Sequence, residues 1–327
     1  MFFTRVIIPR SALNIDYSGK YLFVGSCFSE NIGNKFKNSK FNVVINPSGI
    51  IYNPLSIKSL FDSLLKNKIY TPADLFFDGD KYRCFDFHGR FADRDAAKLV
   101  ETINQSLLDA RNFLSDTDII FITPGTAYVW FLKQSGRVVS NCHKADESIF
   151  LRSMLNVNEI YDAFASIIIG VKSINSKVKF VFSVSPLRHI KDGLHGSQLS
   201  KSSLLLAIDS VVNNFDNAEY FPSYEIVNDE LRDYRFYQQD MIHITPQAEN
   251  YIYNKFKQAY FTFEMRSFSH KVEKFMLAAN HQIIDINSLK TRDFISKTIN
   301  KAVNLQKEIK GLDLSAEIAN FNCLLND

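Results

Sequence analysis

Short apolar strands alternate with amphipathic helices along most of this chain, and this alternation restricts the folds open to it. The strand-like runs are apolar on both faces, which is typical of strands covered on both sides in a parallel sheet. They lie at 22–24, 41–45, 118–123, 178–185 and 219–221. Apolar residues at helical spacing predict helices at 28–36, 54–64, 94–115, 158–174, 199–214 and 246–259. We therefore expect an α/β fold, a three-layer α/β/α sandwich with a flavodoxin-like parallel sheet.

Candidate functional residues come directly after four of the predicted strands. Cys27 follows the first strand, Gly49 the second, Gly125 the third, and Arg188 with His189 the fourth. In open parallel sheets, ligands bind at the carboxyl ends of the strands. We therefore expect these residues to meet in one pocket at that edge of the sheet.

The turn Gly25-Ser26-Cys27 joins the first strand to the first helix in the stretch YLFVGSCFSENIGNKF. Gly25 permits a sharp turn. A thiol at the start of a helix meets unpaired N–H groups and the positive end of the helix dipole, which lower a thiol pKa and stabilise an oxyanion. Cys27 is therefore the candidate nucleophile and Ser26 the second candidate. The alternative interpretation is a buried, inert cysteine.

The segment DMIH places Asp240 three residues before His243, just ahead of the last predicted helix of the α/β region. At this spacing the carboxylate accepts a hydrogen bond from one ring nitrogen, and the other nitrogen faces the nucleophile. His243 is the candidate general base, and Asp240 would orient it. Such a pair alone is more often structural, but its place in a chain whose first strand ends in GSC favours catalysis.

Several blocks between about residues 20 and 260 resemble the GSCFA-domain family. They are GSCFS at 25–29, with serine in place of the final alanine, NPSGIIYNP at 46–54, NCHK at 141–144, SVSPLRH at 183–189, FPSYEI at 221–226 and DELRDYRFYQQDMIH at 229–243. The DMIH segment also looks like the DxxH block of the SGNH/GDSL hydrolases, with which the family is grouped. The resemblance implies an SGNH-hydrolase-like fold and reaction class, and it names no substrate.

The same resemblance implies an oxyanion hole with three donors. They would be the Cys27 N–H, Gly49 after the second strand and an asparagine after the third. The chain has Gly-Thr-Ala at 125–127 where that asparagine is expected. Asn141 of the NCHK block and the backbone at 125–127 are the candidate replacements. Loss of one such donor typically lowers the rate about 100- to 1000-fold.

Polar residues near these strand ends are the candidate substrate-binding groups. They are Ser26, Asn46, Gly125, His143, Arg188 and His189. Arg188 suits a substrate carboxylate or phosphate, although a solvated polar loop explains Arg188 and His189 equally well. His143 is more often a structural residue in such a context.

Composition and spacing exclude several classes of function. The net charge of +3 comes from scattered Lys and Arg residues, so no nucleic-acid partner is expected. Four unevenly spaced cysteines predict no disulfide framework, and the pairs Cys84/His88 and Cys142/His143 suit zinc poorly, so we expect neither a metal nor a cofactor. The chain shows no apolar signal segment and no run of membrane-spanning length, so we expect a cytoplasmic protein without membrane contacts.

The composition changes near residue 262. Residues 1–262 carry the alternation and the motif blocks, and we expect them to form the SGNH-hydrolase-like domain. Residues 263–327 are charged and helical in pattern, and we expect a helical C-terminal extension. These helices pack on the domain or form a homo-oligomer, and the sequence does not choose between the two.

Three functions fit this pattern. The first is a hydrolase or acyltransferase that acts on a small-molecule or glycan-linked acyl ester through Cys27, with His243 and Asp240 as the base pair. The second is a non-catalytic module that binds a ligand or carbohydrate on a decayed hydrolase scaffold, which the missing asparagine favours. The third is a thiol peptidase, because cysteine, histidine and a carboxylate also form that triad.

Overall fold

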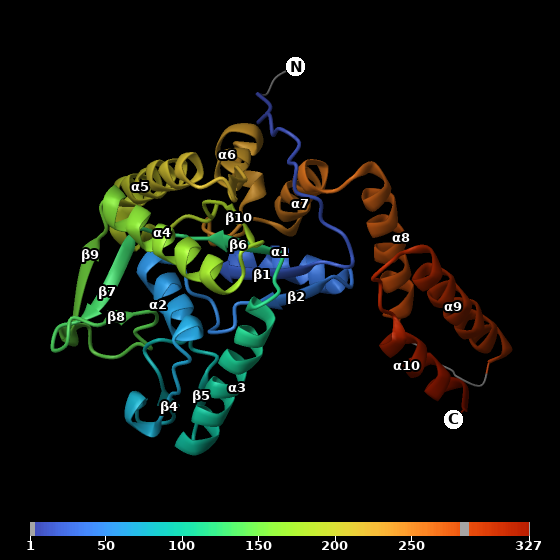
Figure 1. Cartoon of the computed structure of the whole chain (residues 1–327), viewed down its shortest axis with the longest axis horizontal. Coiled ribbons are helices and arrows are strands. Elements are labelled where there is room, and N and C mark those ends of the chain that lie inside the picture. The colour runs from blue at the N-terminus through green and yellow to red at the C-terminus, as the bar shows by residue number, and fades with distance from the viewer. Residues whose placement is uncertain (1–3, 282–287, 327) are drawn as a thin grey trace.

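A five-stranded parallel sheet forms the centre of the molecule (Figure 1). The computed structural model describes residues 4–281 and 288–326. The sheet contains β1 (Lys20–Gly25), β2 (Asn42–Ile45), β6 (Ile119–Thr123), β10 (Lys179–Phe182) and β11 (Ala218–Tyr220), in the order β11-β10-β6-β1-β2. This is the strand order of the flavodoxin-like fold, with the reversal at β1. The predicted parallel sheet is confirmed, and each predicted strand lies within a few residues of an observed one.

Helices cover both faces of this sheet. One face carries α2 (Pro54–Leu65), α3 (Ala96–Leu114), α4 (Val157–Ile174) and α5 (Gly193–Asn214), and the other carries α1 (Cys27–Asn38) and α7 (Pro246–Tyr260). Each layer has its own apolar cluster. The structure therefore confirms the predicted α/β/α sandwich.

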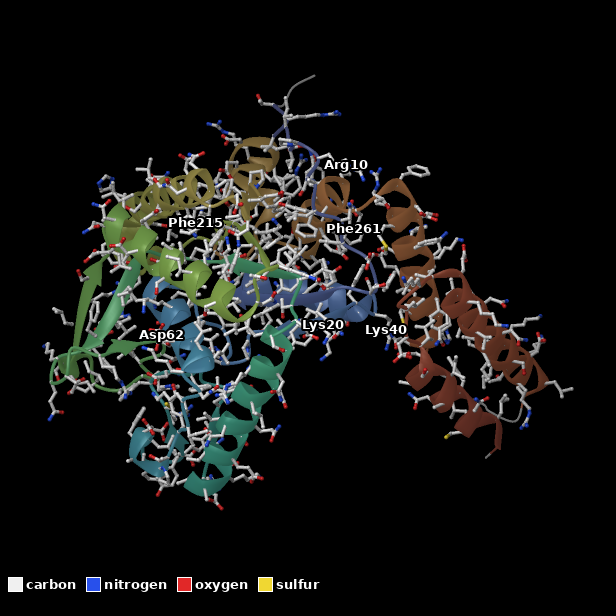
Figure 2. The ribbon with its side chains drawn as sticks, in the orientation of Figure 1. Arg10, Lys20, Lys40, Asp62, Phe215 and Phe261 are labelled. Carbon is white, nitrogen blue, oxygen red and sulfur yellow. The ribbon has the colours of Figure 1, made fainter. Side chains whose placement is uncertain are left out.

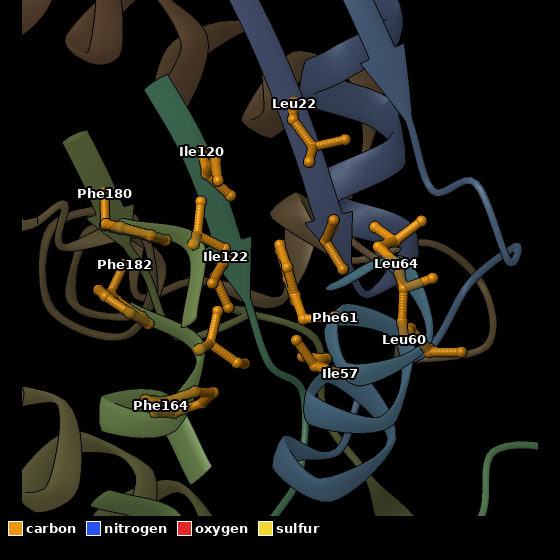
Figure 3. Packing of buried hydrophobic residues seen from close by; sticks show 14 of the residues in the cluster. Leu22, Ile57, Leu60, Phe61, Leu64, Ile120, Ile122, Phe164, Phe180 and Phe182 are labelled. Carbon is orange, nitrogen blue, oxygen red and sulfur yellow. The ribbon is translucent and has the colours of Figure 1, made fainter. Parts of the chain in front are cut away.

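Side chains of β1 alternate between the two apolar clusters. Leu22 points to the face of α2, where it belongs to the same cluster as Phe61 and Ile122 (Figure 3). Phe23 points to the opposite face and stacks on Phe121, with the ring centroids 4.4 Å apart. Alternate side chains of a strand leave opposite faces of a sheet, so both helical layers hold β1 in place. Packing on both faces of β1 therefore fixes the position of Cys27, which follows this strand.

Two small antiparallel sheets extend the sandwich. The first contains β3 (Phe76–Phe77), β4 (Tyr82–Arg83) and β5 (Ala92–Asp93), and the second contains β7 (Tyr128–Leu132), β8 (Val138–Val139) and β9 (Phe150–Met154). None of these short strands is among the strands predicted from the sequence. The second sheet follows β6 directly, and it forms a wall beside the carboxyl edge of the main sheet.

Short helical turns complete the α/β part of the chain. They are η1 (Pro72–Asp74), η2 (Glu147–Ile149), η3 (Ile190–Asp192), α6 (Ser223–Glu225), the π-type turn η4 (Ile226–Leu231) and η5 (Tyr234–Phe236). Among the described helices of the chain, none is both long and apolar enough to cross a bilayer.

The C-terminal part is helical, as predicted. It contains α8 (Phe263–Ala279), α9 (Leu289–Glu308) and α10 (Ser315–Asn326), which form an arm beside the sandwich in Figure 1. Val272 and Phe275 of α8 belong to the same apolar cluster as Phe23. Lys40, labelled in Figure 2, forms an ion pair with Glu317 of α10 at 2.6 Å. The helices of this arm therefore pack on the α/β part along the side of α1.

Candidate active site

A glycine turn sets the position of Cys27. Gly25 has φ of +144°, and a Cβ atom at this position would lie 2.3 Å from the carbonyl oxygen of Thr123 on β6. Only glycine fits this approach. The next residue, Ser26, donates its N–H to the same carbonyl at 3.0 Å. The chain then turns into α1, and Cys27 becomes the first residue of that helix.

The start of α1 has unused hydrogen-bonding capacity. Ser26 occupies the N-cap position, but its side chain makes no capping hydrogen bond. Its Oγ atom is buried and has no hydrogen-bond partner. The backbone N–H groups of Cys27 and Phe28 are near enough to the Cys27 sulfur to lower the thiol pKa, although burial raises it by more. These two donors could stabilise negative charge on or beside the sulfur.

The predicted lowering of the Cys27 pKa is wrong. Burial raises the pKa of the thiol, and the N–H groups of Phe28 and Cys27 lower it by less than burial raises it. The carboxylates of Glu249 and Glu30 raise it further. The resting side chain is therefore a thiol, and attack on a substrate requires a base that removes its proton.

Asp240 and His243 form the predicted pair. His243 Nδ1 lies 2.6 Å from Asp240 Oδ2, and Asp240 Oδ1 accepts the backbone N–H of His243 at 3.0 Å. The hydrogen bond with His243 is the main cause that lowers the pKa of Asp240 to about 2. Because Nδ1 faces the carboxylate, Nε2 is the nitrogen left to act as a base.

Glu249 connects this pair with Cys27. It lies in the first turns of α7, where its Oε1 accepts a hydrogen bond from Asn31 Nδ2 of α1 at 2.5 Å. The charge of His243 lowers the pKa of Glu249, although burial is the larger effect and raises it. The carboxylate of Glu249 in turn acts on Cys27. Sulfur and imidazole therefore share one neighbouring carboxylate.

The structure shows no closed triad. Within the described part of the chain, no hydrogen bond joins the Cys27 sulfur to His243. The side chains of His243 and Asp240 are 47% and 43% exposed, so the pair is in contact with solvent. Catalytic hydrogen bonds are often long without substrate and shorten when it binds. His243 and Cys27, the candidate base and nucleophile, therefore lie at one edge of the sheet without a hydrogen bond between them.

Asn46 and Gly49, predicted to bind substrate and oxyanion, are engaged inside the protein. Asn46 is fully buried, its Oδ1 accepts the N–H of Gly25 at 2.9 Å, and its Nδ2 donates to Glu30 at 3.2 Å. The N–H of Gly49 donates to the carbonyl of Asn46 at 2.8 Å. Asn46 positions the turn before Cys27, and the Gly49 N–H is not free for an oxyanion in this structure.

The backbone after β6 is also engaged. The N–H groups of Gly125 and Thr126 both donate to the carbonyl of Tyr52, at 2.7 and 3.2 Å. The predicted donors at 125–127 are therefore not available here. The phenol of Tyr52 lies near both the cysteine at the start of α1 and the polar groups beyond it, because the charges of Cys142, Arg152 and Cys27 all act on it. Burial raises the pKa of Tyr52, so its hydroxyl keeps its proton and can donate a hydrogen bond.

A cavity of about 490 Å³ lies next to Tyr52, between the sandwich and the sheet of β7, β8 and β9. It is lined mainly by aromatic, basic and amide side chains, among them Tyr52, Trp130, Asn141, Arg152, His189 and Lys191. The indole ring of Trp130 lies 5.1 Å from the Arg152 guanidinium and 4.6 Å from Lys191 Nζ. Cys27 does not line this cavity, but Tyr52 does, and the charges of Cys27 and of Cys142 in the cavity lining both act on its phenol.

Asn141 and His143 lie in this cavity and not beside Cys27. The Oδ1 atom of Asn141 accepts the backbone N–H of His143 at 2.8 Å. His143 Nε2 lies 2.8 Å from the carbonyl of Cys84 and must donate to it, so the second nitrogen carries no proton when the ring is neutral. Burial lowers the pKa of His143, which favours that neutral ring. Among residues 4–281 and 288–326, no cluster of three metal-ligating side chains occurs.

Arg188 and His189 point to different parts of the site. The backbone N–H of Arg188 donates to the carbonyl of Ile242 at 3.4 Å, and its guanidinium lies 4.5 Å from the ring centre of Tyr237. His189 faces the cavity, with its ring centre 5.9 Å from that of Tyr52. The loop after β10 thus reaches from the segment that carries His243 to the cavity.

Lys201 is a charged residue of this edge that the sequence does not reveal. It lies on α5, is 2% exposed, and donates from Nζ to the carbonyl of Ser185 at 2.7 Å. Burial lowers its pKa to about 7, and the charge acting on it is that of Cys27. Helical periodicity places this position on α5 but cannot show that a lysine is buried there.

The comparison with protein-family models agrees with the motif blocks. The GSCFA family model matches residues 20–256. Among solved structures, the chain is similar to an acetyl xylan esterase, Est2A, from the rumen bacterium Butyrivibrio proteoclasticus, with 12% sequence identity and a TM-score of 0.36. That match covers 75% of this chain and 64% of the esterase, slightly less than two thirds of its length. No curated protein matches the chain by sequence. Because the family model covers most of the chain, from β1 through His243, the chain belongs to the GSCFA family.

Proposed function

We propose that this protein is an SGNH-like hydrolase or acyltransferase that acts on an ester-type acyl bond through Cys27. The observation that carries the proposal is the Asp240–His243 hydrogen bond of 2.6 Å, which leaves His243 Nε2 free at the edge of the sheet where Cys27 begins α1. Such a base is required because the thiol pKa is raised. Glu249, which acts on both groups, supports their placement in one site.

The reaction would begin with attack of the Cys27 sulfur on the acyl carbonyl carbon. As the C–S bond forms, His243 Nε2 takes the thiol proton and the carbonyl π electrons move to the oxygen. The oxyanion would receive hydrogen bonds from the N–H groups of Cys27 and Phe28, which lie near the sulfur. When the carbonyl re-forms, the ester C–O bond breaks and the leaving alkoxide takes the proton from His243.

A thioester on Cys27 is then the intermediate. Water, or an acceptor alcohol or amine, would attack its carbonyl while His243 takes the proton of the attacking group. The C–S bond breaks as the carbonyl re-forms, and the sulfur regains a proton from His243. Hydrolysis and acyl transfer differ only in this attacking group, and both remain part of the proposal.

The cavity beside Tyr52 is the proposed site for the rest of the substrate. Its volume of about 490 Å³ falls within the usual range for small-molecule pockets. Trp130 and Tyr128 offer ring faces, while Asn141 and Lys191 offer hydrogen bonds. This lining suits a polar, hydroxyl-bearing ligand such as a small-molecule or glycan-linked acyl ester. The Tyr52 hydroxyl would lie between this part of the substrate and the reacting carbonyl.

A second candidate function is a non-catalytic module that binds such a ligand on a decayed hydrolase scaffold. The raised thiol pKa and the internal hydrogen bonds of Gly49 and Gly125 favour it, because they remove features that an esterase uses. The cavity would serve a binding protein equally well. Covalent chemistry at Cys27 distinguishes the two functions.

The deciding experiment is to trap the acyl group on the protein. Full-length protein is mixed with para-nitrophenyl acetate, quenched in acid, and analysed by peptide mass spectrometry. We expect an acetyl group on Cys27, loss of turnover in Cys27→Ala and His243→Ala, and normal turnover in Cys323→Ala, which removes an exposed thiol of α10. Full activity in Cys27→Ala, or an acetyl group on Ser26, would overturn the role of the thiol.

A further inference from the structure

Lys201 is unusual because its charge is buried without a carboxylate. Its side chain is 2% exposed, and its Nζ atom donates to the neutral carbonyl of Ser185 at 2.7 Å. Within the described residues, no Asp or Glu forms an ion pair with it. A buried ammonium normally needs a compensating charge, and without one the proton is easily lost. Lys201 therefore keeps its charge best when a negative charge is present nearby.

The fold places Lys201 and Cys27 on either side of the same strand end. Ser26 N–H donates to the carbonyl of Thr123 at 3.0 Å, and Ser185 N–H donates to the carbonyl of Pro124 at 2.9 Å. The chains of Cys27 and Ser185 thus flank the end of β6, in the strand order β10-β6-β1. Neighbouring strands lie about 4.8 Å apart, so β1 and β10, on the two sides of β6, are roughly 9.5 Å apart.

We propose that Lys201 is a positioning residue of the proposed reaction, whose ammonium charge balances the Cys27 thiolate across the end of β6. The inference rests on the proposed function for its catalytic meaning, but the coupling of the two charges is a property of the resting protein. The amine acts through the field and not by contact, because no hydrogen bond joins it to the sulfur within the described part of the chain.

Tyr224 and His189, which also lie near Lys201, do not supply the negative charge that Cys27 can supply. Tyr224 of α6 presents its ring 5.8 Å from Nζ, and burial raises the pKa of that phenol, so it stays neutral. His189 is positioned so that the charge of Lys201 helps to lower the pKa of its ring, after the larger effects of burial and Arg152. These neighbours are neutral or repulsive. Cys27 is the group that can supply negative charge when its proton is removed.

The expected coupling is large enough to measure. Opposite unit charges about 10 Å apart, at an effective dielectric constant near 20, shift each other's population on the order of tenfold. The thiolate of Cys27 would be favoured while Lys201 carries its proton and less favoured once that proton is lost. The two groups then titrate as a coupled pair.

The test measures alkylation of Cys27 by iodoacetamide as a function of pH, in full-length protein without substrate. Peptide mass spectrometry measures the alkylation of Cys27 and of the exposed Cys323 in the same sample, so Cys323 is an internal control. Lys201→Met removes both the charge and the hydrogen bond, and Lys201→Gln removes the charge but keeps a donor. Lys177→Met, an exposed lysine before β10, is the matched control.

We expect alkylation of Cys27 to be about tenfold slower in both Lys201 variants near neutral pH, with the pH curve displaced to higher pH. Cys323 and the Lys177→Met protein should behave as in the wild type. Unchanged Cys27 curves in folded Lys201→Met would overturn the inference. If Lys201→Gln matched the wild type while Lys201→Met did not, the hydrogen bond to Ser185 would be the cause, and the inference would also fail.

The wild-type protein gives a second measurement should a variant fail to fold. Coupling predicts that the alkylation rate of Cys27 rises less steeply above about pH 7, where Lys201 loses its proton. A single, simple titration would count against the coupling. If the alkylation curves of Cys27 were displaced in the Lys201 variants but the protein had no esterase activity, only the proposed function would be refuted. If the protein had esterase activity but the alkylation curves were unchanged in the Lys201 variants, only the role of Lys201 would be refuted.

Discussion

The side-chain oxygen of Asn46 accepts a hydrogen bond from the backbone N–H of Gly25 at 2.9 Å. This bond joins the loop after β2 to the turn after β1, and the same side chain also donates to Glu30 of α1 at 3.2 Å. The carbonyl of Asn46 receives a further hydrogen bond from Arg90 Nη2 at 2.5 Å. Asn46 therefore holds together, around Cys27, the turn after β1, helix α1 and the segment between β4 and β5.

Replacement of Asn46 by alanine should destabilise the protein and displace Cys27. The variant leaves the buried N–H of Gly25 without its acceptor, and a loss of this kind lowers the free energy of unfolding by about 1–3 kcal/mol. Circular dichroism should record a melting temperature several degrees lower. The control is Asn34→Ala, which changes an exposed residue of α1 and should leave the melting temperature close to that of the wild type. An unchanged melting temperature in Asn46→Ala would show that the hydrogen bond between Gly25 and Asn46 is dispensable for stability.

Asp240→Asn should lower kcat by roughly 1000- to 10,000-fold without unfolding the protein, because the amide no longer fixes the ring of His243 in the required tautomer. The low pKa of Asp240, about 2, means that the carboxylate stays ionised from mildly acidic to alkaline pH. A fall of activity in mild acid would therefore not come from protonation of Asp240. The measurement is the pH dependence of ester hydrolysis in both proteins.

Asp229→Asn provides the control for this substitution. Asp229 is an exposed carboxylate that precedes the same loop, and its removal should leave kcat unchanged. A similar small effect for both variants would mean that the 2.6 Å bond between Asp240 and His243 has no part in turnover.

Trp130 makes the cavity directly observable, because the chain contains a single tryptophan. Its ring lies between Arg152 and Lys191 in the cavity lining, so a ligand that enters should change its emission. We expect a saturable change when Cys27→Ala protein is titrated with an acetylated methyl glucoside. Lys191→Met should weaken the binding, whereas Lys177→Met should not. Turnover of this compound by the wild type without a saturable signal would exclude the cavity as the substrate pocket.

The sequence predicts the main sheet and its helices well because their signals are local. The run 158–174 has the apolar spacing of α4, observed as Val157–Ile174, and Thr245 caps α7 as its position before Pro246 predicts. The strands β7 and β9 were not predicted. Their paired residues lie 18 to 26 positions apart in the sequence, and no pattern within Tyr128–Leu132 reveals so distant a partner.

The sequence predicts the edge of the sheet at which the candidate residues lie, but not their arrangement: of Cys27, Gly49, Gly125, Arg188 and His189, expected in one pocket, only His189 lines the cavity beside Tyr52. Cys27, Gly49, Gly125 and Arg188 do follow strand ends, because parallel strands bring their carboxyl ends to one edge. The direction of the Cys27 pKa shift was wrong, since the helix start is visible in the sequence but the burial that outweighs it is not. The amides of Gly49 and Gly125 are engaged by carbonyl groups whose positions depend on tertiary structure.

The buried amine of Lys201 should also appear in the stability of the protein. Its pKa falls from 10.5 in the unfolded chain to about 7 in the folded protein. Between these values the unfolded chain binds the extra proton, so the free energy of unfolding should rise with pH in this window, by at most about 1.4 kcal/mol per pH unit. Below about pH 7 the full penalty of burying the charge applies.

Urea unfolding of the wild type and Lys201→Met at several pH values isolates this contribution. The raised pKa values of Cys27 and of buried tyrosines such as Tyr253 act in the opposite direction in more alkaline solution, but both proteins share them. Lys201→Met should therefore be the more stable protein near neutral pH, and its advantage should shrink as the pH rises. Lys177→Met, which removes an exposed amine, should follow the wild type. Parallel stability curves for the wild type and Lys201→Met would mean that Lys201 keeps an ordinary pKa, and the buried charge proposed to balance Cys27 would lose its physical basis.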